Sequence, residues 1–151
     1  MRQIKREDWE SHKNYPHQVL LLGSHENFRR ISSLLVHRAQ HSGEVSGIES
    51  LYRRWKSAMR GHEYYEEHKL YPYLAERWGV SFRDAEAGHE ALRERDRDVH
   101  SAFRDTTSST ALTDAMHGHH NVLIEHLQYE EDLVIPLLLE LPAEEFRRTF
   151  G

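Results

Sequence analysis

The sequence predicts an all-α protein, built as an antiparallel up-down four-helix bundle with a short C-terminal helix. Four stretches carry apolar residues at the three- and four-residue spacing of an amphipathic helix. Short polar segments separate these stretches, which favours antiparallel neighbours. No segment has the pattern of a strand, and charged residues form 30% of the chain while prolines number only four. This composition suits long helices with a solvent-exposed face.

The expected elements follow one another along a single domain. We expect helices at about 16–41, 46–72, 82–104 and 110–140, and a short closing helix at about 142–149, within one domain spanning 1–151. Pro16 suits the first turn of the first helix, and Gly43 suits its end. Ser81 and Asp84 have the spacing of a capping box at the start of the third helix. The polar stretch Thr106–Thr110 supplies the loop before the fourth.

Pro72 interrupts the second helix. A proline inside a helix lacks a backbone donor and clashes with the preceding turn. We therefore expect the helix to break near Pro72, and residues 73–78 to form a bent or separate turn before Gly79.

The composition also limits the functions to consider. The absence of cysteine excludes disulfides, iron–sulfur clusters and thiolate zinc, and it fits a reducing cytosol. The apolar runs at 19–22 and 133–139 are too short to cross a bilayer, and residues 1–10 lack the apolar run of a secretory signal. A net charge of −5 without a basic stripe argues against nucleic acid. We expect a cytoplasmic protein without membrane or nucleic-acid partners.

The most informative motif is a His-x-x-x-Glu unit that occurs twice, with its copies 64 positions apart. A lone histidine precedes each unit by 37 positions. The duplicated residues are His25, His62 and Glu66 in the first half and His89, His126 and Glu130 in the second. Residues four apart share one helix face, and both units lie on the apolar stripe of their helix. Six matched positions indicate one site rather than coincidence.

Helix geometry places the four histidines at one level of the bundle. Each hairpin climbs from its lone histidine to the turn and returns over a similar number of residues, at roughly 1.5 Å per residue. A buried carboxylate without a partner is costly, whereas Glu66 and Glu130 could each bridge two metal ions that take two imidazoles apiece. Nitrogen and oxygen ligands suit iron, manganese or zinc, while calcium and magnesium prefer oxygen alone. The sequence therefore predicts a two-metal site.

This pattern resembles the hemerythrin-like, or HHE cation-binding, family of non-haem di-iron four-helix bundles, from the first helix to the fourth. The resemblance implies two iron ions joined by an oxo or hydroxo bridge. It implies that His25 and His62 hold one iron, that His89 and His126 hold the other, and that Glu66 and Glu130 bridge them. Ferritin-like di-iron bundles differ, because they place Glu before His at a three-residue spacing.

The chain departs from the oxygen-carrying members of that family at two places. Their third helix has a second histidine four residues after the first, where this chain has Arg93, and the counterpart in the first half is Arg29. Without that imidazole each iron keeps about one open position. The carriers' second bridging carboxylate would fall on Glu131, but we expect Glu130 to bridge because four residues is nearer a full turn. Glu67 and Glu131 are then expected beside the ligands.

Open positions favour redox turnover of a small oxidant over reversible oxygen carriage. We expect peroxide, O2 or NO as the ligand, with catalase-like disproportionation as one activity. The alternative is a non-enzymatic oxygen carrier, iron-binding protein or redox sensor. A haem bundle with two of the histidines as axial ligands is a third possibility.

Other polar residues lie on the same helix faces. Tyr65 and Tyr129 each follow a site histidine by three residues. Either phenol could donate a hydrogen bond to a bound oxygen species or ligate ferric iron, or simply pack in the bundle. His119 and Asp96 lie two turns from site histidines, and for both a structural pairing is favoured over metal ligation.

Overall fold

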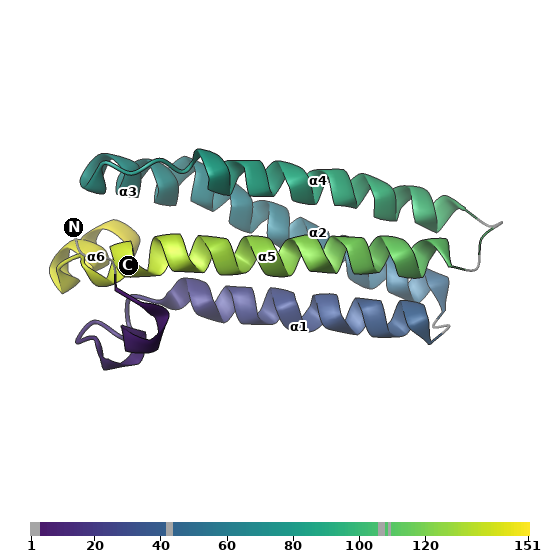
Figure 1. Ribbon diagram of the computed structural model, residues 1–151, viewed down its shortest axis with the longest axis horizontal. Coiled ribbons are helices and arrows are strands. Elements are labelled where there is room, and N and C mark those ends of the chain that lie inside the picture. The colour runs from purple at the N-terminus through teal and green to yellow at the C-terminus, as the bar shows by residue number, and fades with distance from the viewer. Residues whose placement is uncertain (1–3, 42–43, 106–107, 109) are drawn as a thin grey trace.

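The computed structural model describes residues 4–41, 44–105, 108 and 110–151, and every regular element within them is helical. In chain order the elements are the 3-10 helix η1 (Arg6–Ser11), α1 (Leu20–Gln40), α2 (Val45–Tyr65), the π-helical segment η2 (Glu66–Leu70), α3 (Tyr71–Trp78), α4 (Arg83–Arg104), α5 (Ala111–Leu139) and α6 (Ala143–Phe150). The long helices α1, α2, α4 and α5 run alternately in opposite directions (Figure 1). The predicted all-α four-helix bundle is confirmed.

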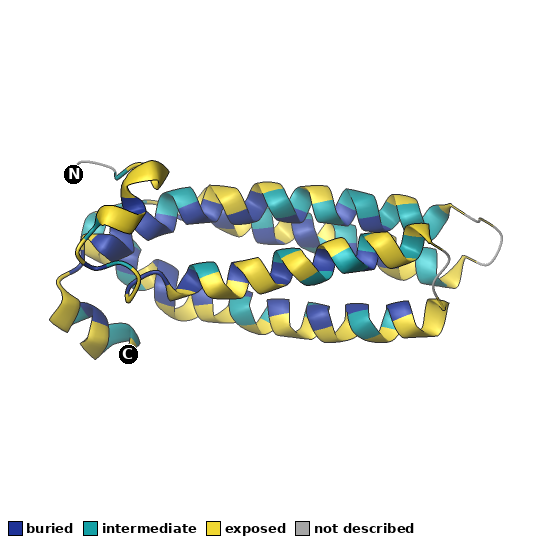
Figure 2. Ribbon diagram, turned by 90° about the horizontal axis from the view of Figure 1, so that it is seen from below, coloured by how far each residue is buried: buried dark blue, intermediate teal, exposed yellow. Residues whose placement is uncertain are grey.

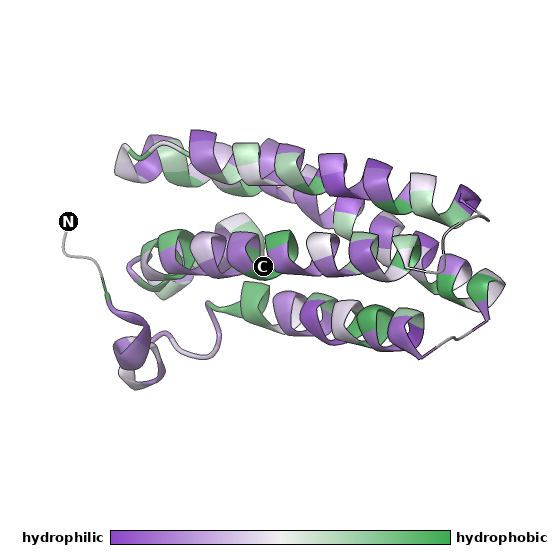
Figure 3. Ribbon diagram, turned by 45° about the vertical axis from the view of Figure 1, so that its right-hand side comes forward, coloured by the Kyte–Doolittle hydropathy of each residue, from purple (hydrophilic) through white to green (hydrophobic). Residues whose placement is uncertain are grey.

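Neighbouring helices close the bundle. α1 packs against α2 and α5, and α4 packs against α5 and α2. η1 and α6 lie at the same end of the bundle as α3, on the left in Figure 1. Hydrophilic and hydrophobic residues alternate along each long helix, as amphipathic helices require (Figure 3). Among the described helices, none is long and apolar enough to cross a membrane.

Two clusters of buried apolar side chains fill the interior. Buried residues recur along each long helix among intermediate and exposed ones (Figure 2). One cluster gathers residues of α3, α6 and the adjacent ends of α1 and α5, and the other gathers residues nearer the α1–α2 and α4–α5 connections. In α1 the buried residues run from Leu21 in one cluster through His25 to Phe28 in the other. The long helices therefore carry a buried polar layer between two apolar ones.

The second helix contains an irregular turn that the sequence prediction misplaced. In η2 the backbone N–H of Tyr71 donates to the carbonyl of Glu66, five residues back. Pro72 then lies in the first turn of α3, where its missing donor is tolerated. The helix continues to Trp78 and ends at Gly79, whose φ is 68°. An interruption near Pro72 is therefore present, but it lies just upstream as a π-turn, and residues 71–78 form a separate helix instead of a bent turn.

Residues before α1 close the end of another helix. The side-chain amides of Asn14 and Gln18 donate to backbone carbonyls at the end of α5, at 2.6–3.1 Å. The last carbonyls of a helix lack intrahelical donors, so these amides satisfy them. α1 consequently begins at Leu20 rather than near Pro16.

The start of α4 also differs from the expectation. Its N-cap residue is Phe82, without a side-chain cap. The Ser81 hydroxyl instead accepts a hydrogen bond from the backbone N–H of Arg83 at 3.2 Å, so the predicted capping box with Asp84 is wrong. Gly43, expected to end the first helix, and positions 106–107 and 109 of the expected polar loop lie outside the described residues.

Candidate metal centre

The duplicated histidines and glutamates meet in the polar layer between the two apolar clusters. They are contributed by α1 (His25), α2 (His62), η2 (Glu66), α4 (His89) and α5 (His126 and Glu130). One group that could hold a metal ion is His25, His62, Glu66 and Glu130, and another is His89, His126 and Glu130, with ligand atoms within 4.8 Å of one another in each group. Only His62 is partly open, with 13% of its side chain exposed.

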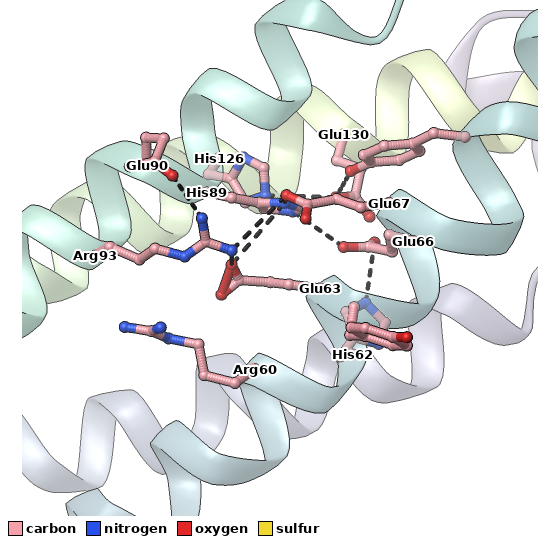
Figure 4. A network of polar contacts seen from close by, with 12 residues as sticks. Arg60, His62, Glu63, Glu66, Glu67, His89, Glu90, Arg93, His126 and Glu130 are labelled. Carbon is pink, nitrogen blue, oxygen red and sulfur yellow. Dashed lines mark hydrogen bonds and ion pairs between the residues drawn. The ribbon is translucent and has the colours of Figure 1, made fainter.

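Glu66 divides its two carboxylate oxygens between the halves of the site. Its Oε2 lies 3.1 Å from Nε2 of His62, and its Oε1 lies 3.1 Å from Nε2 of His89. Figure 4 shows this carboxylate between the two imidazoles. One carboxylate thus reaches both halves.

Glu130 divides its oxygens in the same way. Its Oε1 lies 3.2 Å from Nε2 of His25, and its Oε2 lies 3.4 Å from Nε2 of His126. Each of the two glutamates therefore places one oxygen toward each half of the site, an arrangement that would let both carboxylates bridge two cations.

The buried polar atoms of the donor set fit bound metal ions. Within the described residues, the buried atoms without a hydrogen bond include Oε2 of Glu66, Oε1 of Glu130 and Nε2 of His126. An unsatisfied buried polar atom costs about 1–3 kcal/mol. All three atoms belong to residues of the two ligand groups, so cations bound there would satisfy them. Imidazole nitrogen and carboxylate oxygen suit iron, manganese or zinc.

In the first half of the site, Glu131, which directly follows Glu130, holds the ring nitrogen of His25 that faces away from the ligand group. Nδ1 of His25 donates to Oε2 of Glu131 at 2.7 Å. Arg29, one turn after His25, approaches the same carboxylate oxygen at 2.6 Å, and Arg6 of η1 approaches the other at 3.2 Å. A proton fixed on Nδ1 turns Nε2 toward the site, where a bound cation would take the place of the second proton.

The second half repeats this arrangement with weaker support. Nδ1 of His89 donates to Oε1 of Glu67 at 2.8 Å. Arg93 lies 3.8 Å from that oxygen and pairs more closely with Glu90, at 2.5 Å (Figure 4). Arg93, which stands where the oxygen carriers have a second histidine, therefore pairs with carboxylates behind the site.

The electrostatics of the site reflect its excess of carboxylates. Burial lowers the pKa of His25, but Glu130, Glu131 and Glu66 outweigh burial and raise this pKa to about 10. The pKa of His89 rises to about 11 for the same reason, again against burial. Burial opposes ionisation of Glu130, yet hydrogen bonds with its neighbours hold its pKa well below the usual value. The layer attracts positive charge.

A further buried carboxylate, Glu63, lies beside the second half of the site. Its Oε2 lies 3.7 Å from Arg93 and 3.9 Å from Nδ1 of His89 (Figure 4). Burial raises the pKa of Glu63 to about 7, despite the cations nearby. Its repeat counterpart is Leu127, so the duplication gave no signal for it.

Tyr71 also contacts the site, and sequence reasoning missed it. Its hydroxyl donates to Oε2 of Glu130 at 2.6 Å. Tyr71 follows Glu66 by five residues, and the π-turn between them brings the two residues onto the same side of the helix. The three- and four-residue spacing of an α-helix does not predict this. The phenols that were predicted, Tyr65 and Tyr129, are 41% and 44% exposed.

Gly88 allows close packing around His126. A Cβ atom at Gly88 would lie 2.1 Å from Nδ1 of His126, which no real contact allows. At Gly61, which precedes the other His-x-x-x-Glu unit, nothing lies within 4 Å of an added Cβ. Only one of the two glycines is therefore required by the site.

His119 and Asp96 pair with each other away from the two ligand groups. Nε2 of His119 lies 3.1 Å from Oδ1 of Asp96, and both side chains are buried. Arg60 donates to Oδ2 of Asp96 at 3.0 Å, and the Tyr52 hydroxyl donates to Oδ1. This network is the structural pairing that the sequence favoured for both residues.

The fold and site define a helical bundle with a buried histidine–carboxylate cation site. Residues 18–139 match the family model of the hemerythrin HHE cation binding domain, and the chain belongs to this family. Comparisons with curated proteins and with solved structures gave no significant match. Family membership and the two ligand groups together imply that the protein binds metal ions.

Proposed function

We propose that this protein is a non-haem di-iron protein that binds and turns over small oxidants, with peroxide as the first substrate to test. The observation that carries the proposal is the division of the oxygens of Glu66 and Glu130 between the two halves of the site. Two buried carboxylates in this arrangement hold two cations close together, as one-electron and two-electron chemistry at paired irons requires.

Each residue of the repeat then has a defined part. His25 and His62 would hold one iron, His89 and His126 would hold the other, and Glu66 and Glu130 would offer one oxygen to each. Bound iron supplies redox chemistry and open positions for small ligands. Glu131 and Glu67 orient the histidines through Nδ1, and the phenol of Tyr71 fixes the bridging carboxylate of Glu130.

A cavity beside His62 gives a small molecule a route to the first half of the site. It has a volume of about 250 Å³ and is lined mostly by apolar residues of α1, η2, α5 and α6, together with His62 and Tyr65. Apolar walls suit an uncharged ligand such as hydrogen peroxide, O2 or NO. The partial exposure of His62 agrees with entry at this point.

The arginines in place of extra histidines favour turnover over storage of oxygen. Arg29 and Arg93 point to Glu131 and to Glu67 with Glu90, so neither contributes a nitrogen ligand. Two histidines and two bridging carboxylates leave each iron short of its usual coordination number. An exchangeable position on each metal suits repeated turnover.

The direct test is peroxide consumption by the iron-loaded protein, measured as oxygen evolution. We expect steady consumption of peroxide that depends on loaded iron. A stable oxygenated form that reverses over many cycles, without peroxide consumption, would instead show an oxygen carrier.

The cavity provides a matched pair of variants for the same assay. Ser24 lines the cavity, whereas Asn27 is exposed on the same helix and does not. We expect Ser24→Phe to slow peroxide consumption while iron content stays unchanged, and Asn27→Phe to leave the rate unchanged. Equal rates in both variants would mean that the substrate enters elsewhere.

A further inference from the structure

A chain of aromatic rings leads from the candidate metal centre into the apolar cluster beyond it. The His62 and Phe28 ring centroids lie 5.3 Å apart, and those of Phe28 and Trp55 lie 5.9 Å apart. Trp55 stacks on Tyr52 at 6.2 Å, with their planes inclined by 18°. Nε1 of Trp55 donates to the backbone carbonyl of Phe28 at 3.1 Å. At about 1.5 Å per residue, Trp55 lies about 10 Å and Tyr52 about 15 Å along α2 from His62.

Tyr52 is the last ring of this chain, and its hydroxyl faces a carboxylate that can accept its proton. Its hydroxyl donates a short hydrogen bond to Oδ1 of Asp96. His119 and Arg60 also donate to Asp96, at 3.1 and 3.0 Å. Burial opposes ionisation of Asp96, but these donors keep its pKa below the usual value, so it is a carboxylate. Burial and the Asp96 charge raise the pKa of Tyr52, so its phenol does not ionise unless it also loses an electron.

The Tyr52 end of the chain also reaches a surface depression. Tyr52 lines a cavity of about 280 Å³ together with Arg53, Lys56, His100, Phe103 and Glu49. The rim carries two cationic side chains against one carboxylate, which favours a small anionic molecule. The structure therefore connects the polar layer, through two oxidisable side chains, to a place where a reductant can approach.

We propose that Trp55 and Tyr52 form a one-electron relay between the metal centre and this depression, with Asp96 as the acceptor of the phenolic proton. The relay rests on the proposed function, because it needs an oxidised centre at one end. Phenylalanine is too hard to oxidise to act as a stepping stone, so Phe28 only fills the gap between His62 and Trp55.

The relay step balances in electrons and protons. Hydrogen peroxide takes two electrons and two protons from the centre and solvent to become two waters, so the relay would operate twice. Each time, Trp55 would give one electron to the oxidised centre, and Tyr52 would then give one electron to Trp55. The O–H bond of Tyr52 breaks, and its proton moves to Asp96, leaving a neutral tyrosyl radical beside a neutral carboxylic acid. A one-electron reductant of the ascorbate class, bound in the depression, reduces the radical, and the proton returns from Asp96 to Tyr52.

Tyr71 is the competing site for a radical because it contacts the site directly. Its hydroxyl donates to Glu130, so its oxidation would protonate a carboxylate that the metals need. Asp96 belongs to neither ligand group and can take a proton without loss of a ligand. The geometry therefore assigns the stable radical to Tyr52.

The test is freeze-quench electron paramagnetic resonance of the iron-loaded full chain after mixing with hydrogen peroxide. We expect a tyrosyl signal in the wild type that is lost in Tyr52→Phe and weakened in Trp55→Phe. Asp96→Asn should slow the appearance of the signal, and ascorbate should shorten its life. The matched control is Tyr73→Phe, because Tyr73 pairs with Glu145 far from the relay; it should keep the signal. Thermal unfolding of each variant confirms that it folds.

A signal that persists in Tyr52→Phe, or that disappears only in Tyr71→Phe, overturns the relay. So does a loaded wild type that consumes peroxide without forming any tyrosyl signal. Photochemical oxidation of the metal-free protein by ruthenium(III) tris-bipyridine separates this result from failure of the proposed function. If iron does not load, a Tyr52 radical that depends on Asp96 in this second experiment still supports the relay, and its absence overturns it.

Discussion

The two halves of the site offer the same ligand types in different surroundings. In the first half, Glu131 is held by Arg29 and Arg6, and His62 opens on a cavity. In the second, His126 is packed against the backbone at Gly88. The shared residues form two groups that could hold a metal ion, and under the proposed function the unshared residues would decide which half a substrate reaches. The halves are therefore expected to differ in ligand entry more than in metal affinity.

The largest expected effect breaks both halves at once. Glu130→Gln keeps the shape of the side chain but removes a charge that faces both histidine pairs. We expect loss of metal affinity beyond the roughly 10–100-fold typical of residues behind the ligands. Iron titration of the variant measures it. Retention of two tightly bound irons would show that Glu130 does not bridge.

A glycine pair tests the closed packing of the second half. The methyl group of Gly88→Ala would clash with the imidazole of His126. We therefore expect this imidazole to be displaced and the second iron to bind about 10–100-fold more weakly. Gly61→Ala is the matched control, because its added methyl meets nothing and stabilises the helix by up to about 1 kcal/mol. Iron content and thermal unfolding of both variants check this. Identical metal binding in the two would contradict the difference between the halves.

The carboxylates behind the histidines should differ in importance. Glu131 is 1% exposed and is held by two arginines, whereas Glu67 is 24% exposed and lies 3.8 Å from its one. We expect Glu131→Gln to weaken iron binding toward the upper end of about 10–100-fold, and Glu67→Gln toward the lower end. Competition with a chelator measures both. A larger loss in Glu67→Gln would reverse the ranking.

The smallest expected effect concerns stability and leaves the metals in place. Asp96 faces Tyr52 and Arg60 on α2 and His119 on α5, which together keep its folded-state pKa below the unfolded value of about 3.9. Its contribution is therefore present above about pH 4 and is lost as pH falls through the folded pKa.

Asp96→Asn should cost about 1–3 kcal/mol at neutral pH, and the difference from wild type should shrink in acid. Denaturant unfolding at a series of pH values checks the trend. A difference that stays constant into acid would mean that the Asp96 charge contributes nothing.

The site residues that could be predicted from the sequence are those that the internal repeat duplicates. The four histidines and the two glutamates that face both halves stood out because each has a partner 64 positions away. Tyr71, Glu63, Gly88 and Tyr52 have Ile135, Leu127, Ser24 and Met116 as counterparts, so the duplication was silent about them. Their roles come from the asymmetry of the fold.

Local irregularity explains the other misses. The π-turn that begins at Glu66 depends on how the helix packs in the bundle ahead of Pro72, and the helix propensities of single residues do not predict it. The late start of α1 likewise depends on Asn14 and Gln18 reaching the end of a helix more than a hundred residues away in the sequence. Long-range hydrogen bonds overrode the local signal of Pro16.

Metal content combined with an optical spectrum tests the central claim most directly. Anaerobic loading of the purified chain with ferrous iron, followed by oxidation, should give two irons per chain and near-ultraviolet absorption from an oxygen-bridged ferric pair. A chain that takes up only trace metal, or a single ion without those bands, would contradict the account.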